Sequence, residues 1–518
     1  LKVAMLIRTV LTTPAAVGST SGLGALHPVP VHRTSSLHRR LHHHRLQPLA
    51  SQASTSAQAV ALQQQKQSQT SPSGQQHVEE HFWEWRWRSK IRYFKAGSGG
   101  PPLLLIHGFG VGAWHFEKNI QELASKYTVY AIDLLGQGSS WPAQEFVEEL
   151  RTRARAAAAA SAGAPAGAGT VAQGVAPGMG AGVGATGSAA SMDMEPEGEG
   201  ALCYSIDTWT RQMAEFVRDV IRAPAYVAGN SLGGYVATNL AATYGGSVRG
   251  LVLINSTPFW SFKPPASRPQ GVWGLLGLDG TVPVPQGLRR TIEVLWWDRL
   301  RSRDTVASML GLVYAHKPAV EGDAALVSRI IEATEQPGAL DAFASIVLAP
   351  RSELEFDEML ARAGCPVALV YGRQDPWVVP MWGQRAVHTL NAAGAPPVMY
   401  LELDGAGHCP HHEAPRATNT AIATCLDHME AVAGWAAASR QSLDGAEVPP
   451  RPQPPLPVGG RWEVAEDDGS RVVVVEHVAG GPRILPEMLA HAVWKVQAAV
   501  KKVTGQQAPG TSSQGNTA

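Results

Sequence analysis

The chain has 518 residues, 44% of them hydrophobic, and its 43 Lys and Arg residues balance its 43 Asp and Glu residues. A chain of this length can hold one large domain or several small ones, and its zero net charge gives no basic footprint for nucleic acid. Neither a metal motif nor a dinucleotide fingerprint is present, so we predict no metal, no cofactor and no nucleic-acid partner. The cysteines are scattered, which fits free thiols in a reducing compartment better than a disulfide framework or zinc site: Cys203, Cys365, Cys409 and Cys425.

The first 78 residues contain no acidic side chain and are rich in Arg, His, Ser, Thr, Gln and Ala. This composition is typical of a transit peptide, whereas a secretory signal needs one uninterrupted apolar core. The apolar run 3–11 is broken by Arg8. We predict a transit peptide and disordered leader over residues 1–78, with the mature chain beginning between about residues 45 and 80.

The next element is a short apolar run, 103–106, which predicts a strand ending in the loop His107-Gly108-Phe109-Gly110. Glycines in this loop let the backbone fold back toward a neighbouring strand end. We predict that the backbone N–H of Phe109 is one donor of an oxyanion hole and that His107 orients the loop. Asp133 follows a second apolar run, and we interpret it as a loop brace in preference to a catalytic acid.

Residues 143–200 are rich in Ala and Gly and are uncharged from 156 to 192. Their length invites a transmembrane interpretation. However, Ala, Gly, Ser and Pro lack the transfer energy of Leu, Ile and Phe, and Pro165 and Pro177 oppose a helix. We therefore predict no transmembrane segment, and a flexible low-complexity insertion on the surface, because loop closure costs little more for a long loop.

After the insertion, apolar residues at helical spacing over 206–221 predict a helix, and the apolar run 226–228 predicts a strand. The strand leads into Gly229-Asn230-Ser231-Leu232-Gly233-Gly234, which precedes another helix-compatible stretch. A serine between glycines at a strand-to-helix turn is typical of a nucleophile elbow, whose sharp turn requires neighbours nearly free of side chains. We predict Ser231 as the nucleophile and the backbone N–H of Leu232 as the second oxyanion donor.

Between the predicted strands 248–254 and 367–372 lie roughly a hundred residues with helical periodicity and no strong strand signal. We predict a helical lid over about residues 258–362. Aromatic side chains in the lid and beside it are predicted to form the apolar walls of a substrate site for a large, flat or greasy acyl group: Phe259, Trp260, Trp296, Trp297 and Trp377.

Asp375 and His408 each lie in a loop directly after a predicted strand, 367–372 and 398–403 respectively. A serine nucleophile needs a base that takes its proton and a carboxylate that orients the base. We predict His408 as the base and Asp375 as the orienting acid. Two further histidines compete with His408 but follow it on the far side of the loop: His411 and His412.

The chain order Ser231, Asp375, His408 is that of the α/β-hydrolase fold and differs from the chymotrypsin and subtilisin orders. We predict an α/β protein with a mostly parallel central sheet, built from residues 79–142 and 201–430. The helical lid is inserted before the strand that precedes the catalytic Asp.

Beyond this domain, residues 431–460 contain a Pro-rich linker. Residues 461–505 predict a hairpin, centred on Asp468-Gly469, and then a helix, while residues 506–518 predict a disordered tail. The sequence supports docking of this extension against the body of the protein and against a partner equally.

From about residue 83 to residue 427, without the insertion, six motifs of the chain resemble the pheophytinase family, the chloroplast pheophytin pheophorbide hydrolases of plants and green algae. The first three motifs are shared by many α/β-hydrolases, and the last three are more specific. They are His107-Gly108-Phe109-Gly110-Val111-Gly112, Asp133-Leu134-Leu135-Gly136-Gln137-Gly138, the elbow from Gly229 to Ala237, Thr257-Pro258-Phe259-Trp260, Tyr371-Gly372-Arg373-Gln374-Asp375-Pro376-Trp377 and Gly407-His408-Cys409-Pro410-His411.

The resemblance implies hydrolysis of the phytyl ester of magnesium-free chlorophyll in the chloroplast stroma, with Ser231, His408 and Asp375 in the family's catalytic roles. The implied substrate is a hydrophobic tetrapyrrole ester, and the implied partners are the thylakoid surface or other chlorophyll-catabolic enzymes. Three alternatives stay open: a chlorophyll dephytylase, another chloroplast lipid or isoprenoid ester hydrolase, and a ligand receptor built on the same fold.

Overall fold

A computed structural model of the chain describes residues 77–162, 201–259, 261, 263–269, 271–272, 276, 278–316, 323–395, 399–441, 450–455 and 459–476. These residues belong to the unit that begins at Gln76. Four predicted features lie outside the described residues: the leader before residue 77, the insertion from 163 to 200, Trp260, and the chain from residue 477 onward, including the predicted C-terminal helix and tail.

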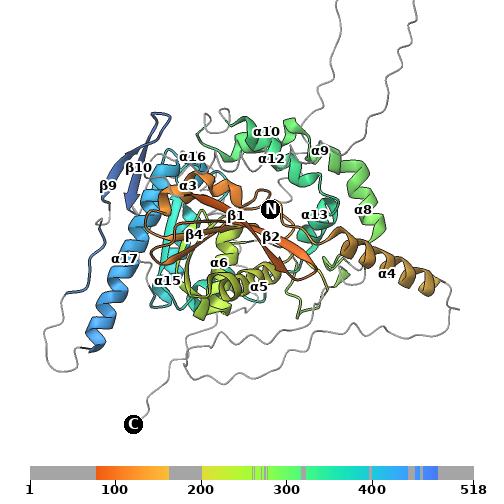
Figure 1. Cartoon of the computed structure of the whole chain (residues 1–518), viewed down its shortest axis with the longest axis horizontal. Coiled ribbons are helices and arrows are strands. Elements are labelled where there is room, and N and C mark those ends of the chain that lie inside the picture. The colour runs from red at the N-terminus through yellow and green to blue at the C-terminus, as the bar shows by residue number, and fades with distance from the viewer. Residues whose placement is uncertain are drawn as a thin grey trace, which may run out of the picture. The chain divides into compact units, whose positions relative to one another are not determined.

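Among the described residues, ten strands form one sheet in the order β1-β2-β4-β3-β5-β6-β7-β8-β10-β9. Figure 1 labels β1, β2 and β4 from one end of this order and β10 and β9 from the other. Neighbouring strands from β4 to β8 in this order pair in parallel, as the predicted fold class requires. Parallel neighbours need helical crossovers, which cover both faces of the sheet and explain the continuous apolar runs in the sequence. The parallel strands are β4 (Thr128–Ile132), β3 (Pro102–Ile106), β5 (Ala225–Asn230), β6 (Val248–Ile254), β7 (Val367–Gly372) and β8 (Met399–Asp404).

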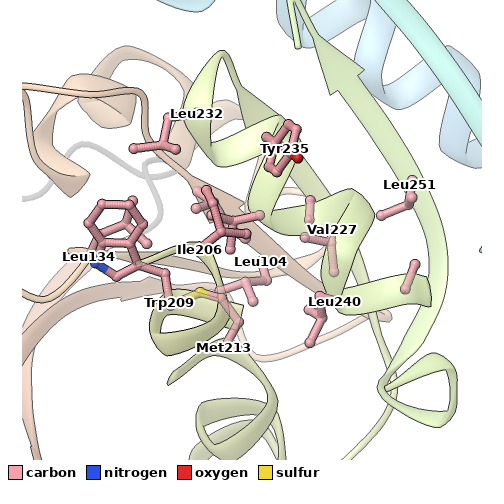
Figure 2. Packing of buried hydrophobic residues seen from close by; sticks show 14 of the residues in the cluster. Leu104, Leu134, Ile206, Trp209, Met213, Val227, Leu232, Tyr235, Leu240 and Leu251 are labelled. Carbon is pink, nitrogen blue, oxygen red and sulfur yellow. The ribbon is translucent and has the colours of Figure 1, made fainter. Parts of the chain in front are cut away.

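Alternate residues of each central strand face opposite sides of the sheet. Leu104 and Ile106 of β3 join one apolar cluster, whereas Leu103 and Leu105 join the other. Several helices contribute side chains to the first cluster, among them Trp209, Met213 and Leu240 (Figure 2). These helices are α5 (Ile206–Phe216) with its π-helical end η2 (Val217–Ile221), α6 (Leu232–Thr243), α14 (Phe356–Arg362) and α15 (Met381–Ala392).

The opposite face is covered by Phe116 and Ile120 near the start of the domain and by Ile422 and Leu426 near its end. The long helix α17 contacts β6, β7 and β8 as well as α3. The short 3-10 turn η3 (Gly245–Ser247) connects α6 to β6. The helices of this face are η1 (Ala113–Phe116), α3 (Glu117–Leu123), α16 (Pro410–Glu413) and α17 (Pro415–Gln441).

The described part of the segment between β6 and β7 contains helices, as predicted for the lid, and its longest unbroken described stretches are 278–316 and 323–366. Ser302 and Asp323 cap two of its helices by accepting the backbone N–H groups of Thr305 and Leu326. The lid helices that precede α14 are α8 (Gln286–Ile292), η4 (Glu293–Trp297), α9 (Asp298–Leu300), α10 (Arg303–Val313), α12 (Ala324–Thr334) and α13 (Ala339–Leu348).

Two antiparallel strands precede the parallel part of the sheet and were not predicted: β1 (Val78–Trp85) and β2 (Ser89–Ala96). β2 pairs with β4 and so extends the sheet at that edge. Trp85 donates its indole N–H to the buried carboxylate of Glu215, 2.5 Å away. The alternating residues Trp83, Trp85 and Trp87 therefore pack against the core, and Trp85 also binds a helix through Glu215.

We predicted a flexible insertion over residues 143–200, and this prediction is wrong for the first part of that range. Residues 144–162 form helix α4 (Gln144–Ala162), in which Val147 is buried and Phe146 and Leu150 pack against the core. Arg151 binds Asp341 of α13 with an N–O distance of 2.5 Å. Apolar side chains at helical spacing anchor the first two turns, and the alanines that follow have the highest helix propensity, which continues the helix.

The hairpin of the C-terminal extension docks on the body of the protein. The rest of the extension lies outside the described residues, so its docking against the body or against a partner stays a prediction. The hairpin consists of β9 (Arg461–Ala465) and β10 (Arg471–Glu476), and β10 pairs antiparallel with β8. Val472 and Val474 are buried against the sheet. Figure 1 shows the hairpin beside α17, which it contacts.

Candidate active site

Ser231 lies between β5 and α6 with φ 53° and ψ −112°, a strained backbone conformation for a residue with a side chain. A larger residue would not fit at the glycines around it, because neighbouring backbone atoms lie too close. A Cβ on Gly233 would lie 2.2 Å from the carbonyl oxygen of Ile106, and a Cβ on Gly229 would lie 2.4 Å from that of Gly233. The chain therefore makes the sharp strand-to-helix turn that the motif predicted.

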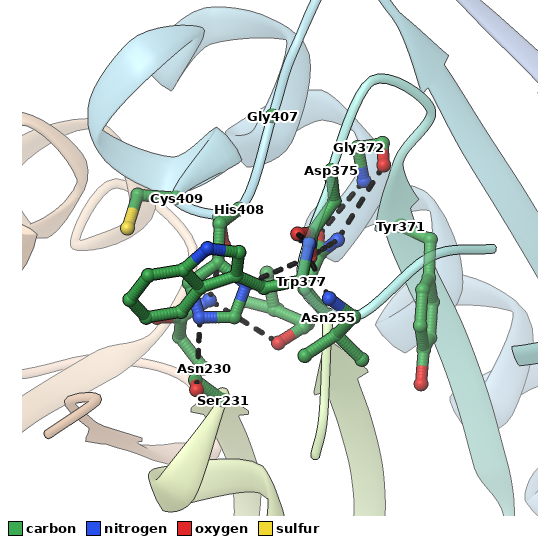
Figure 3. Close-up of polar contacts among 12 residues, drawn as sticks. Asn230, Ser231, Asn255, Tyr371, Gly372, Asp375, Trp377, Gly407, His408 and Cys409 are labelled. Atoms are coloured by element: carbon green, nitrogen blue, oxygen red, sulfur yellow. Dashed lines mark hydrogen bonds and ion pairs between the residues drawn. The ribbon is translucent and has the colours of Figure 1, made fainter. Parts of the chain in front are cut away.

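The structure brings together the three side chains that the sequence placed in one site (Figure 3). Ser231 Oγ is 2.9 Å from His408 Nε2, and His408 Nδ1 is 2.7 Å from Asp375 Oδ2. Because a carboxylate only accepts, His408 donates its Nδ1–H to Asp375, and its Nε2 can accept the hydroxyl proton of Ser231. All three come from the carboxyl ends of parallel strands, where α/β sheets bind their ligands.

The carboxylate of Asp375 is fully buried and accepts hydrogen bonds at both of its oxygens. Its Oδ1 accepts the backbone N–H groups of Trp377 and Val378 at 2.7 and 2.9 Å. Its Oδ2 accepts the side-chain amide of Asn255 at 2.8 Å in addition to His408. These donors fix the plane of the carboxylate.

The sequence reasoning missed two asparagines of this network. Asn255 directly follows β6, adopts a left-handed φ of 40° and also accepts the backbone N–H of Gly372 at 2.8 Å. Asn230 donates to the carbonyl oxygen of His408 at 3.0 Å. Asn230 lies inside the elbow motif, and Asn255 directly follows a predicted strand. Their positions next to the predicted site were the only sequence signal for a role in it.

Glu413 was also missed, although its carboxylate joins the His408 loop to the base of the lid. Oε1 accepts the backbone N–H of Cys409 at 3.0 Å. Oε2 accepts those of Gly407, Ala315 and His316 at 3.1, 2.7 and 3.0 Å. Glu413 thus holds the residues on both sides of His408 together with the segment that follows α10.

The two competing histidines lie in a buried group behind the site. His411 Nε2 is 2.9 Å from His115 Nδ1, and His412 Nδ1 is 3.3 Å from the hydroxyl oxygen of Tyr314. Burial lowers the pKa of these imidazoles, that of His412 to about 4, so they are neutral at physiological pH. Their contacts assign them to packing, and His408 alone of the three is hydrogen bonded to Ser231.

The loop predicted to carry an oxyanion donor lies against the elbow. A Cβ on Gly108 would lie 3.4 Å from Cβ of Ser231, and the next residue is Phe109. Leu134 donates its backbone N–H to His107 Nε2 at 2.9 Å, so His107 Nδ1–H donates to the carbonyl oxygen of Gly108 at 2.6 Å. Burial lowers the pKa of His107 and keeps this loop-orienting residue neutral.

Leu232 begins α6, where the first N–H groups of a helix have no partner within the helix.

Asp133, which we interpreted as a brace, accepts the backbone N–H groups of Ala113 and Ser139 at 2.6 and 2.8 Å and pairs with Arg92 at 3.1 Å. This confirms the brace interpretation.

Apolar side chains surround the His408 loop. Trp377 lies beside His408, with ring centroids 5.9 Å apart, and packs against a cluster that includes Cys409, Trp114 and Leu310 of the lid. Phe259 is 39% exposed.

Two other predicted wall residues lie in η4. Trp297 packs inside the lid against Phe343, with ring centroids 5.7 Å apart, and Trp296 precedes it in the same turn. This packing accounts for Trp297, so its role in substrate binding stays a prediction, as does that of Trp296.

Within the described residues, no group of three or more His, Cys, Asp or Glu side chains is placed to hold a metal ion. In the same part of the chain, no helix is both long enough and apolar enough to cross a bilayer.

A mostly parallel sheet with a strained serine after β5, a carboxylate after β7 and a histidine after β8 defines an α/β-hydrolase with a serine elbow. Residues 103–421 match the model of the alpha/beta hydrolase family. The chain belongs to this family, and the predicted fold class is confirmed.

The chain is 36% identical over 367 residues to the chloroplastic pheophytinase of Arabidopsis thaliana, a match that covers 67% of this chain and 66% of that protein. The match thus spans slightly less than two thirds of the relative, and it confirms the resemblance to pheophytinases. Among solved structures, a membrane phospholipase A has a TM-score of 0.43 and 19% identity, covering 73% of this chain and 96% of its own. A thermophilic esterase from Thermogutta terrifontis has a TM-score of 0.42 and 17% identity, covering 68% and 99%.

Proposed function

We propose that this protein is a carboxylic ester hydrolase that cuts the phytyl ester of pheophytin and releases phytol and pheophorbide in chlorophyll breakdown. The observation that carries the reaction type is the hydrogen-bonded series Ser231, His408 and Asp375 at a strained elbow. The substrate is supported by the similarity to the chloroplastic pheophytinase of Arabidopsis. The same similarity and the acid-free leader support a chloroplast location, in the stroma or at the thylakoid surface, where other chlorophyll-catabolic enzymes are candidate partners.

In the proposed mechanism, His408 Nε2 takes the hydroxyl proton as Ser231 Oγ attacks the ester carbonyl carbon. The backbone N–H groups of Phe109 and Leu232 stabilise the oxyanion. His408 then protonates the departing phytol oxygen, which leaves the pheophorbide acyl group on Ser231. A water molecule, deprotonated by His408, hydrolyses this acyl-enzyme, while Asp375 stabilises the imidazolium in both steps.

The proposed walls of the macrocycle site are aromatic: Phe259, Trp260, Trp296, Trp297 and Trp377. The serine mechanism uses no metal, so the magnesium of chlorophyll affects only the fit of the ring. Magnesium carries an axial ligand that adds height to one face of the ring. Burying that ligand beside an indole, or leaving the coordination site unfilled, costs about a few kcal/mol and favours the metal-free pigment.

The decisive experiment is product analysis after incubation of the full chain with pheophytin and chlorophyll side by side. We expect much faster phytol release from pheophytin. Comparable specificity constants would identify a dephytylase, and tight binding without turnover would identify a receptor. Ser231→Ala should abolish nearly all turnover and keep pigment binding, because only a hydroxyl group is lost; wild-type rates in this variant would exclude a covalent mechanism.

A further inference from the structure

The lid carries an apolar pair of side chains on its outer surface. The segments α8, η4 and α9 follow one another without a break from Gln286 to Leu300. On their inner side, Ile292 is buried and Trp297 packs against Phe343. On the outer side, Val294 and Leu295 are 73% and 60% exposed. These two adjacent side chains form a small exposed apolar patch on one helical turn.

Basic side chains lie one helical turn away on each side of this pair. Arg290 is four residues before Val294, and Arg299 is four residues after Leu295; both are exposed. Residues four apart share a face of a helix, so the apolar pair is flanked by two guanidinium groups along the outer face. An apolar centre with Arg at its borders is the pattern of helices that lie in the interface of a lipid bilayer.

A cavity of about 750 Å³ adjoins the same face. Val294, Arg289 and Arg290 line it from the lid, and Arg151 and Arg155 line it from α4. Two carboxylates are present in the lining, and one of them, Asp341, is shared by Arg151 and Arg289. Glu148, which is outside the lining, binds Arg151 and Arg155 at 3.2 and 3.5 Å, so these four arginines meet three carboxylates and one positive charge is left over next to the exposed apolar pair.

We propose that this lid face, defined by Arg290, Val294, Leu295 and Arg299, docks on a lipid surface that carries anionic headgroups. Val294 and Leu295 enter the boundary between headgroups and acyl chains, and the arginines bind the headgroups. The inference rests on the proposed function, because a phytyl ester partitions into lipid and has to reach the site from there.

A second copy of the chain fits this face less well than a lipid surface. In a twofold contact, the arginines at the borders of one face would meet arginines of the other. A stable interface also buries about 800 Å² on each partner, far more than two aliphatic side chains provide. The charge of the face therefore favours an anionic surface over self-association.

The test is co-sedimentation of the full chain with two kinds of vesicle, phosphatidylcholine alone and phosphatidylcholine mixed with phosphatidylglycerol. We expect binding to the anionic vesicles only, weakened at least about tenfold by the double change Val294→Asp and Leu295→Asp. Arg290→Gln with Arg299→Gln should remove the preference for phosphatidylglycerol. The matched control is Phe82→Asp, because Phe82 is 56% exposed but lies on β1, outside the lid; it should bind as the wild type does.

Three results would overturn the proposal: equal binding of the wild type to both vesicles, unchanged binding of the Val294 and Leu295 variant, or a dimer in light scattering that this variant dissociates. Turnover of a water-soluble short-chain ester and of detergent-dispersed pheophytin should be the same in all these proteins. Failure of pheophytin turnover in detergent would count against the proposed function alone, because vesicle binding is measured without catalysis.

Discussion

Asp375→Asn removes the charge of the buried carboxylate and keeps its shape. Oδ1 accepts the backbone N–H groups of Trp377 and Val378, so the amide oxygen of Asn has to take the Oδ1 position. The amide NH₂ group then takes the Oδ2 position, where it points at His408 Nδ1 and at the side-chain amide of Asn255. Opposed donors in a buried site cost about 1–3 kcal/mol, which His408 avoids by losing its Nδ1 proton.

In that tautomer Nε2 carries the proton and donates to Ser231 Oγ, so it can no longer accept the hydroxyl proton. We expect turnover to fall about 10⁴-fold, which corresponds to roughly 5 kcal/mol in the activation barrier. Phytol release at saturating pheophytin measures this loss. The rate at which a fluorophosphonate labels Ser231 reports the activation of the nucleophile without the pigment, and circular dichroism confirms that the fold is kept.

Asp133→Asn is the matched control, because it makes the same chemical change in another buried aspartate. Asp133 braces its loop and should affect stability, with labelling of Ser231 within about tenfold of the wild-type rate. The reasoning is refuted if Asp375→Asn lowers turnover only a few fold, or if Asp133→Asn causes the larger loss of labelling.

Three further changes test the packing and the electrostatics around the site. Gly233→Ala should prevent folding or greatly reduce soluble yield, since its Cβ would lie 2.2 Å from a carbonyl oxygen of β3; a stable, active variant would contradict the elbow geometry. Glu413→Gln should lower stability by about 3 kcal/mol and slow turnover, because in either orientation its amide NH₂ group faces a backbone N–H donor that the carboxylate accepts; an unchanged melting temperature would count against it. Burial raises the pKa of Glu476 to about 7, so its contribution to stability is full below the ordinary Glu pKa and is lost as the pH rises through 7. Glu476→Gln should therefore be neutral near pH 5 and stabilise by about 2 kcal/mol near pH 8 after allowance for solvent screening, as measured by urea unfolding; equal effects at both pH values would disprove the shift.

The three predicted residues that the structure brings together are those whose positions depend on local backbone geometry. The glycines of the elbow are needed wherever a strand turns directly into a helix, so Ser231 could be located from six consecutive residues. Asp375 and His408 follow apolar runs that are buried on both faces, which makes the ends of their strands easy to place.

The residues that the sequence did not reveal act through contacts between distant segments. Asn255 and Asp375 are 120 positions apart, and the role of Asn255 exists only because β6 and β7 are neighbours in the sheet. Glu413 accepts N–H groups from the lid nearly a hundred residues earlier, a pairing that no local pattern encodes. The prediction for α4 was wrong because it rested on the low-complexity composition of the segment. It gave too little weight to the high helix propensity of alanine and to the few apolar residues that anchor the helix.

The C-terminal hairpin holds both ends of the loop that carries His408. Before the loop, β8 ends at Asp404, and β10 pairs with β8 up to that residue. After the loop, α17 begins at Pro415, and Glu466 of the hairpin turn accepts the backbone N–H groups of Arg416 and Ala417 at 3.0 and 2.9 Å, as a capping carboxylate at the positive end of the helix. Asp468, two residues further on, pairs with His316 at the base of the lid at 2.6 Å. The hairpin thus contacts the strand before the His408 loop, the helix after it and the lid segment at His316, and together with Glu413 it fixes the position of that loop.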